Sequence, residues 1–247
     1  MIRGLYTSAT GMLATQTQSE LIGDNVANIK TPGYKEQLAS NSSFPLMLIQ
    51  RIGGSPTSGA TPIGELGTGV GVDRVTLSNT QGVLQTTDVK TNLALTSPGY
   101  FVVQTPGGER YTRNGNFQLD SLGMLQTPDG HAVLGDIGPI GPLSSDFSVN
   151  SDGMVVDKGQ SLDRIRIVDI PAEALKREGQ SLYSASQPVQ VSVGSQVLQG
   201  SVEASNVDLS GQMIHMMTVM KAYEANQRVI QTQDDMLGKA VNEVGKI

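Results

Sequence analysis

The sequence contains no cysteine and no tryptophan, and aromatic residues make up only 4% of it. The absence of cysteine excludes disulfides, thiolate metal sites and thiol catalysis. No run of basic residues is present and the formal net charge is −6, so nucleic-acid binding has little electrostatic support. No stretch of about eighteen apolar residues occurs, which excludes a helix that spans a bilayer.

The opening "MIRGLYTSATGMLATQTQ" has neither the apolar region nor the small-residue cleavage site of a secretory signal. If the protein leaves the cytoplasm, we therefore expect another route. Glycine accounts for 29 of the 247 residues, well above its usual share of about 7%. This composition favours many turns and short strands, arranged in one or two domains.

Residues 1–33 predict a helix that ends sharply and belongs to an inner domain. Apolar side chains recur there at alternating spacings of three and four residues, at Ile2, Leu5, Ala9 and Met12. The helix is expected to stop at a proline, which lacks an N–H and disfavours helix in the preceding residue. The residues of this predicted chain-redirecting turn are Asn28, Thr31, Pro32, Gly33 and Tyr34.

The middle of the chain divides into two parts. Residues 34–75 form a Gly/Pro-rich tract, predicted to be an extended connecting segment without regular structure. Residues 76–204 contain short β-branched or aromatic runs such as "GYFVVQT" and "DRIRIVDI", and predict a β-rich outer domain with one short helical turn at 171–177. Three dipeptides predict tight hairpin turns with positive φ: Asn114-Gly115, Asp129-Gly130 and Asp152-Gly153.

Residues 205–247 predict a second long helix of the inner domain, capped by Asp208 or Ser210. A 3-4-3-4 spacing continues through the whole segment, which is typical of a coiled coil. Its positions are Met213, Met216, Met220, Tyr223, Gln227, Ile230, Asp234, Leu237, Val241 and Val244.

The two terminal stripes lead to a prediction of fold and association. We expect a mainly β central domain with long N- and C-terminal helices that form an antiparallel, coiled-coil-like pair, with Leu5 near Val241. Two helices cannot bury both stripes, so the apolar members of the two stripes form a predicted assembly interface. Periodicity alone leaves a closed oligomer and an open polymer both possible.

Several segments resemble one known family. "ANIKTPGYK" at 27–35 and the opening "GLYTSATGMLATQTQ" are similar to the N-terminal helix of bacterial flagellar rod and hook proteins, and 205–237 resembles their C-terminal helix. "GTGVGVDRVTLSNTQGVLQTTD" resembles their β domain, and the chain length fits a rod protein of the proximal or distal subgroup.

The resemblance implies a structural subunit of the basal-body rod in the cell envelope that polymerises with itself through its terminal helices. It also implies contact with other rod proteins and with the hook protein, transmission of motor torque to the hook, and export by the flagellar export apparatus without a cleaved signal.

Signals for chemistry are weak. "GTGVGV" lacks the Lys-Ser/Thr of a phosphate-binding loop, and His131 and His215 have no second ligand at metal spacing. We therefore expect no enzyme, cofactor, metal or small-molecule substrate, and no nucleic acid. The alternative function is a secreted β-domain binding or adhesin module on a coiled-coil stalk; a hydrolase ranks last. Deleting either terminal helix separates the first two, because only the rod subunit needs them to assemble.

Overall fold

The computed structural model describes residues 2–51, 61–179, 181–186, 190–191 and 194–244. The chain forms two compact units, which we describe separately. The first unit comprises Met1–Asp24, Leu38–Thr76 and Ser210–Ile247, and the second comprises Asn25–Gln37 and Leu77–Leu209. The chain therefore crosses between the units four times, after residues 24, 37, 76 and 209.

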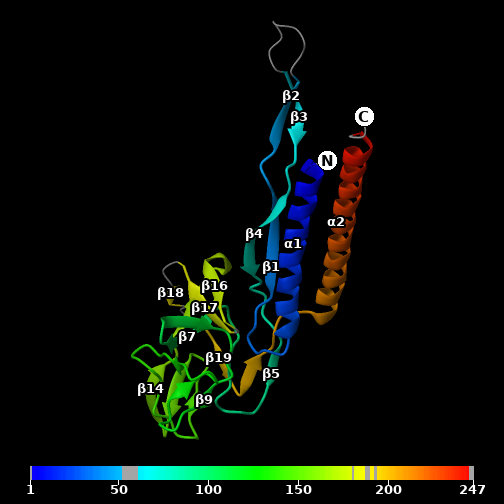
Figure 1. Ribbon diagram of the computed structural model, residues 1–247. Coiled ribbons are helices and arrows are strands. Elements are labelled where there is room, and N and C mark those ends of the chain that lie inside the picture. Colours follow the sequence, from blue (N-terminus) through cyan, green and yellow to red (C-terminus); the bar gives the residue numbers. More distant parts are fainter. Residues whose placement is uncertain (1, 52–60, 180, 187–189, 192–193, 245–247) are drawn as a thin grey trace. The chain divides into compact units, whose positions relative to one another are not determined.

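The first unit contains the two long helices. α1 (Ile2–Ala27) and α2 (Leu209–Val244) lie side by side and run in opposite directions (Figure 1). Asp208 directly precedes α2, at one of the two positions expected to cap it. The predicted fold class, a β-rich region flanked in sequence by long terminal helices that pack on each other, is confirmed.

The first unit also contains paired strands. β1 (Gln37–Ser43) pairs with β4 (Val70–Leu77), and β2 (Met47–Arg51) pairs antiparallel with β3 (Thr61–Leu66). The tract expected to lack regular structure is therefore strand-rich. Most side chains of β1 are exposed, so backbone pairing forms these strands without the apolar alternation that would reveal them.

The second unit is built of short strands. β7 (Tyr100–Thr105) lies inside the largest sheet, whose order among the described residues is β16-β17-β8-β7-β11-β10-β9, with β15 pairing with β7 and with β18. Smaller pairings are β12-β13-β14, β19-β6 and β20-β5. The bounds are β5 (Leu84–Thr86), β6 (Leu93–Leu95), β8 (Gly108–Thr112), β9 (Gln118–Leu119), β10 (Leu125–Gln126), β11 (Ala132–Val133), β12 (Ser148–Val149), β13 (Met154–Asp157), β14 (Gln160–Arg164), β15 (Ile167–Asp169), β16 (Leu175–Glu178), β17 (Leu182–Ala185), β18 (Gln190–Val191), β19 (Val197–Gln199) and β20 (Ser201–Glu203).

Strand β7 contributes to two apolar cores. Phe101 and Val103 belong to one buried cluster and Tyr100 and Val102 to another, because successive side chains of a strand point to opposite faces. All four are at most 4% exposed, so both faces of the sheet are covered at this point. The continuous apolar run "YFVV" follows from that double burial.

Two of the three predicted hairpin turns are confirmed. Gly130 (φ +84°) connects β10 to β11, and Gly153 (φ +80°) connects β12 to β13. The prediction for Asn114-Gly115 is wrong, because this dipeptide joins no hairpin. A Cβ at Gly115 would lie 1.5 Å from the carbonyl oxygen of Leu93, so this glycine permits two backbones to approach. The expected helical turn is a 3-10 helix, η1 (Ala172–Ala174), followed at once by β16.

Candidate functional site

Amide side chains of α2 reach two glycines of α1. A Cβ at Gly4 would lie 2.1 Å from Gln233 Nε2, and a Cβ at Gly11 would lie 2.9 Å from Asn226 Nδ2. The two glycines share one face of α1, because seven residues make nearly two helical turns. The helices thus meet at these points through glycine and amide side chains rather than through large apolar residues.

These contacts fix a register that differs from the predicted one. The residue numbers of the two facing pairs, Gly4 with Gln233 and Gly11 with Asn226, have the same sum, 237, as expected for antiparallel helices. Pairing Leu5 with Val241 would give 246, so the predicted register is wrong by nine residues, or about 13 Å along the axis. The prediction aligned two apolar stripes, whereas in the structure amide side chains of α2 lie against the glycines of α1.

The predicted interface positions on α2 fall into two sets. Met216, Ile230 and Leu237 are half-buried, whereas Met213 and Val241 are 58% and 70% exposed. Met220 and Tyr223 are exposed as well. The side chain of Val244 lies outside the described part of the structure.

On α1, Leu5 and Met12 are half-buried and Ala9 is exposed, while the side chain of Ile2 is not among those described. Ala9 and Met12 line one shallow groove of about 350 Å³ together with Tyr223 and Ile230. The structure therefore brings these four predicted interface residues together, along one side of the helix pair.

The first half of α2 carries an uncovered apolar surface. Met213, Ile214, Met217 and Met220 are 58%, 60%, 57% and 55% exposed. We call these four residues the methionine face. Exposed apolar groups that lie together on one helix commonly mark a surface at which proteins associate, and methionine adapts its shape to its partner.

The predicted turn after α1 is held by specific contacts of the second unit. The Thr31 hydroxyl donates to Asn28 Oδ1 (3.2 Å), and the N–H of Gly33 donates to the carbonyl of Glu203 (2.7 Å). Gly33 has φ +68°, and a Cβ there would lie 2.3 Å from the carbonyl carbon of Arg113. Glycine is therefore required here both for its conformation and for the lack of a side chain. Pro32 is half-buried.

Asn25 joins the first two crossings of the chain. Its side chain is almost completely buried; Nδ2 donates to the carbonyl of Gln37, and Oδ1 accepts from the Gln37 N–H, both at 2.9 Å. The hydroxyl of Tyr34, itself 1% exposed, also donates to Oδ1 (3.0 Å). The segments on either side of the turn are thereby held together.

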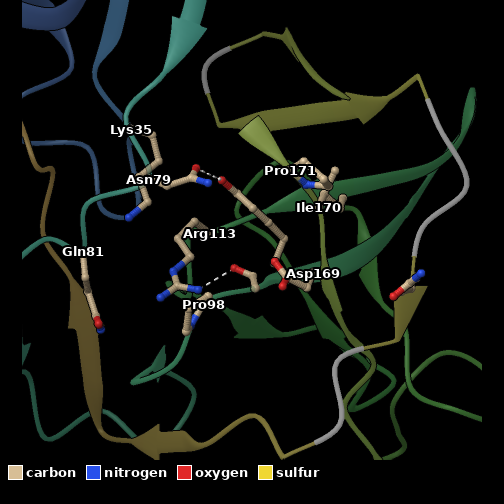
Figure 2. Close-up of a pocket in the computed structure, with 11 residues that line it drawn as sticks. Lys35, Asn79, Gln81, Pro98, Arg113, Asp169, Ile170 and Pro171 are labelled. Carbon is tan, nitrogen blue, oxygen red and sulfur yellow. Dashed lines mark hydrogen bonds between the residues drawn. The ribbon is translucent and has the colours of Figure 1, made fainter. Parts of the chain in front are cut away.

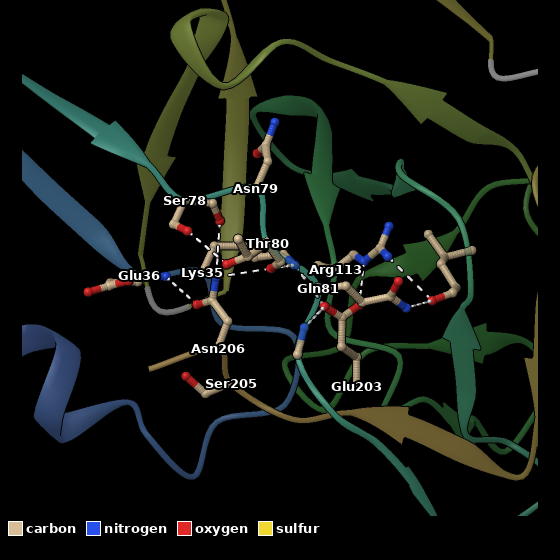
Figure 3. A network of polar contacts seen from close by, with 12 residues as sticks. Lys35, Glu36, Ser78, Asn79, Thr80, Gln81, Arg113, Glu203, Ser205 and Asn206 are labelled. Carbon is tan, nitrogen blue, oxygen red and sulfur yellow. Dashed lines mark hydrogen bonds and ion pairs between the residues drawn. The ribbon is translucent and has the colours of Figure 1, made fainter. Parts of the chain in front are cut away.

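A buried ion triad follows (Figure 3). Lys35 Nζ lies 2.7 Å from Glu203 Oε1, and Arg113 Nε lies 2.6 Å from Glu203 Oε2. The side chains of Lys35 and Arg113 are each 4% exposed, and that of Glu203 is 1% exposed. Burial lowers the pKa of the Lys35 ammonium, while its hydrogen bond to Glu203 acts in the opposite direction.

Asn206 joins the remaining crossings. Its Oδ1 accepts from the N–H of Glu36 (2.7 Å), and its Nδ2 donates to the carbonyls of Ser78 (3.1 Å) and Thr80 (3.0 Å), as Figure 3 shows. We call Asn25, Lys35, Arg113, Glu203 and Asn206 the polar junction. Its members bind segments next to all four points at which the chain passes between the units.

A cavity of about 580 Å³ lies beside the triad (Figure 2). Lys35 and Arg113 line it, together with Asn79, Tyr100 and the exposed Asp169. Burial raises the pKa of Tyr100 to about 12, so its phenol stays protonated at neutral pH.

The described residues contain no group of three or more His, Cys, Asp or Glu side chains placed to hold a metal ion. Among the helices that the structure describes, none has the length and apolar character needed to span a membrane.

Comparison with known proteins gives matches along the whole chain. Three family profiles match: "Flagella basal body rod protein" at 5–35, "Flagellar hook protein FlgE/F/G D1 domain" at 94–157 and "Flagellar basal body rod FlgEFG protein C-terminal" at 198–243. The flagellar hook-basal body complex protein FlhO of Bacillus subtilis is 34% identical, over 100% of both chains. The flagellar basal-body rod protein FlgG of the same organism is 34% identical over 98% of this chain and 99% of its own. FlgG of Caulobacter vibrioides is 32% identical over 96% and 97%.

The chain belongs to the flagellar basal-body rod protein family. It is a structural component of the flagellar basal-body rod and not an enzyme. Because the rod relatives match from end to end, they select the rod subunit over the adhesin module that the sequence left open.

The polar junction of this rod protein is the feature that sequence reasoning missed. Lys35 lay inside the quoted turn motif, but Arg113, Glu203 and Asn206 are too far apart in sequence to form a pattern. The one local signal is Glu203, a carboxylate at a fully buried position of β20. A buried carboxylate requires a cationic partner. A lone acidic residue within an apolar strand is therefore a signal to look for a lysine or arginine that pairs with it.

Proposed function

We propose that the chain builds the rod by self-assembly, with α1 and α2 of neighbouring copies packed together in a helical polymer. In this proposal residues 1–33 and 205–247 form the inner layer, 76–204 the outer layer, and 34–75 the connection. The stripes of both helices, with the methionine face, are the assembly interface.

The observation that carries the proposal is the methionine face. Four large apolar side chains stay more than half exposed, although α2 contacts α1 through Asn226 and Gln233. Burying one such side chain contributes about 1.5–3 kcal/mol, so a row of four provides a strong drive for association. Neighbouring copies in the polymer would supply the cover.

The polar junction supports a role in torque transmission. Any force that passes along the chain between the units must cross at residues 24, 37, 76 and 209. Hydrogen bonds of Asn25 and Asn206 hold the segments next to these crossings to one another. Load would thus be shared by several segments instead of one, as transmission of motor torque to the hook requires.

Partners and location follow from the same proposal. The chain would contact other rod proteins, the hook protein and the flagellar export apparatus, and would reach the rod by type III export without a cleaved signal. These points rest on family membership. The test for export is whether secretion of the chain stops in cells that lack a working flagellar export apparatus.

Assembly is tested by placing a charge on the methionine face. Met220→Asp should block incorporation into rods while the second unit stays folded by near-UV circular dichroism, because a carboxylate cannot be buried there unpaired. Thr232→Asp is the matched control, because it adds the same charge at an exposed polar position of α2. Normal rod formation by the Met220→Asp protein would contradict the proposal.

A further inference from the structure

The ion triad beside the cavity has an excess of positive charge and of hydrogen-bond donors. Lys35 and Arg113 each carry one positive charge and Glu203 one negative charge, which leaves a net charge of +1 among three side chains that are at most 4% exposed. Both cations line the cavity of about 580 Å³ (Figure 2). Burying a net charge is costly unless a counter-charge lies close by.

The donors are incompletely used within the described residues. An ammonium group has three protons, and Lys35 Nζ donates to two oxygens, those of Thr80 (2.8 Å) and Glu203 (2.7 Å). A guanidinium has five N–H protons, and Arg113 donates three of them, to the carboxylate of Glu203 and to the carbonyls of Gly99 and Leu95. One N–H of Lys35 and two of Arg113 therefore remain for a further acceptor.

Among the described residues, the two nearby carboxylates do not supply that acceptor. Glu203 already accepts from Lys35, Arg113 and the N–H of Gly82. The carboxylate of Asp169 also lines the cavity, but it is exposed to solvent, and the structure shows no hydrogen bond or ion pair from it to either cation among the described residues.

We propose that this cavity binds a carboxylate group, which accepts hydrogen bonds from Lys35 and Arg113 and neutralises the excess positive charge. A singly charged group fits better than sulfate or phosphate, because the negative Asp169 lies at the same cavity and would repel a second charge. The carboxylate comes either from an Asp or Glu side chain of a neighbouring subunit or from a free carboxylic acid.

The test is a titration of the full-length chain, kept dilute, with sodium acetate against sodium chloride at equal ionic strength. Backbone amide signals of Gly99 and Gln81 are followed by NMR. Acetate should shift these signals to saturation with a dissociation constant on the order of 10 mM, as expected for a few charge-assisted hydrogen bonds. No saturable shift, or tighter binding of sulfate than of acetate, would overturn the proposal.

Variants of exposed lining residues test the electrostatics without disturbing the triad. Asp169→Asn removes the competing negative charge and should lower the dissociation constant for acetate about three- to tenfold. Asn79→Asp adds a negative charge to the cavity wall at an exposed position and should abolish binding. Asp136→Asn is the matched control, since Asp136 is exposed and does not line the cavity; it should change nothing. Equal affinity in all three variants would refute the assignment.

The source of the carboxylate is decided in assembled rods. If a subunit side chain occupies the cavity, assembled rods no longer bind isotope-labelled acetate, and Asn79→Asp lowers the yield of rods. If rods bind acetate as the dilute chain does, the natural ligand is a free acid. The subunit source rests on the proposed self-assembly, whereas acetate binding by the dilute chain does not, so the two can fail separately.

Discussion

Removal of the buried charge of Glu203 is the sharpest test of the polar junction. Glu203→Gln keeps the size of the side chain but leaves Lys35 and Arg113 as two buried cations without an anion between them. Breaking a buried ion pair by removing one partner costs about 3–5 kcal/mol. We therefore expect a loss of that size in the free energy of unfolding of the second unit.

The measurement is urea unfolding followed by tyrosine fluorescence. The chain has no tryptophan, and four of its six tyrosines (Tyr34, Tyr100, Tyr111 and Tyr183) lie in the second unit, so the signal reports mainly on that unit. Urea is the suitable denaturant because it is uncharged and does not screen the ion pairs, as guanidinium chloride would.

Two controls isolate the electrostatic cause. Asp152→Asn breaks the exposed pair of Arg164 and Asp152 (3.4 Å), whose side chains are 51% and 55% exposed, and should cost at most about 1 kcal/mol. Lys35→Met combined with Glu203→Gln restores the original net charge of the site, so the double variant should lose about 1–3 kcal/mol less than the sum of the single variants. The reasoning would be refuted if the Glu203→Gln protein were as stable as the Asp152→Asn protein. It would also be refuted if the stability losses of Lys35→Met and Glu203→Gln simply added in the double variant.

Three further predictions concern single sites. Gly33→Ala should lower the free energy of unfolding by more than about 2 kcal/mol, because the new Cβ clashes with the backbone of Arg113 and the positive φ is strained for alanine. Gly130 also has a positive φ but lies in open space, so Gly130→Ala should cost about 1 kcal/mol. Urea unfolding measures both losses of stability, and equal losses in Gly33→Ala and Gly130→Ala would contradict the clash with Arg113. Asn206→Ala should speed amide exchange at Glu36 and nearby crossing segments at least tenfold, measured by hydrogen exchange, because it removes the acceptor of that N–H; unchanged exchange would show that Asn206 does not hold them. The folded pKa of Tyr100, about 12, exceeds its ordinary 10.0, so its contribution to stability is complete below pH 10 and is lost as pH rises from 10 to 12. Tyr100→Phe should reduce that loss by up to about 1.4 kcal/mol per pH unit. The measurement is the free energy of unfolding from urea titrations at pH 9, 10 and 11, and an unchanged dependence on pH would contradict the raised pKa of Tyr100.

The helices could be predicted because their signal is local and repeated. Apolar residues at three- and four-residue spacing from Met213 to Val241 indicate one long helix. The other helix was expected to reach the proline at 32, but α1 ends at Ala27, five residues earlier. The register could not be predicted from these stripes. It shows at Gly4 and Gly11, which count as gaps in an apolar pattern although the side chains of Gln233 and Asn226 lie against them.

The strands and the junction show two further limits. β1 has mostly exposed side chains, so its pairing with β4 depends on backbone hydrogen bonds that any residue can make. The junction pairs residues that are far apart in sequence: Lys35 and Glu203 are 168 positions apart, and no repeated pattern links them. Such sites arise only when the fold brings distant segments together, whereas the turn at Gly33 was visible because its residues are consecutive.

The central claim, that neighbouring subunits cover the methionine face, is tested most directly by chemical labelling. The chain has no cysteine, so a single Met217→Cys substitution gives one reactive thiol on that face. The thiol should react readily with a maleimide in the dilute chain and at least tenfold more slowly in assembled rods. Labelling at the same rate in correctly assembled rods would contradict the account.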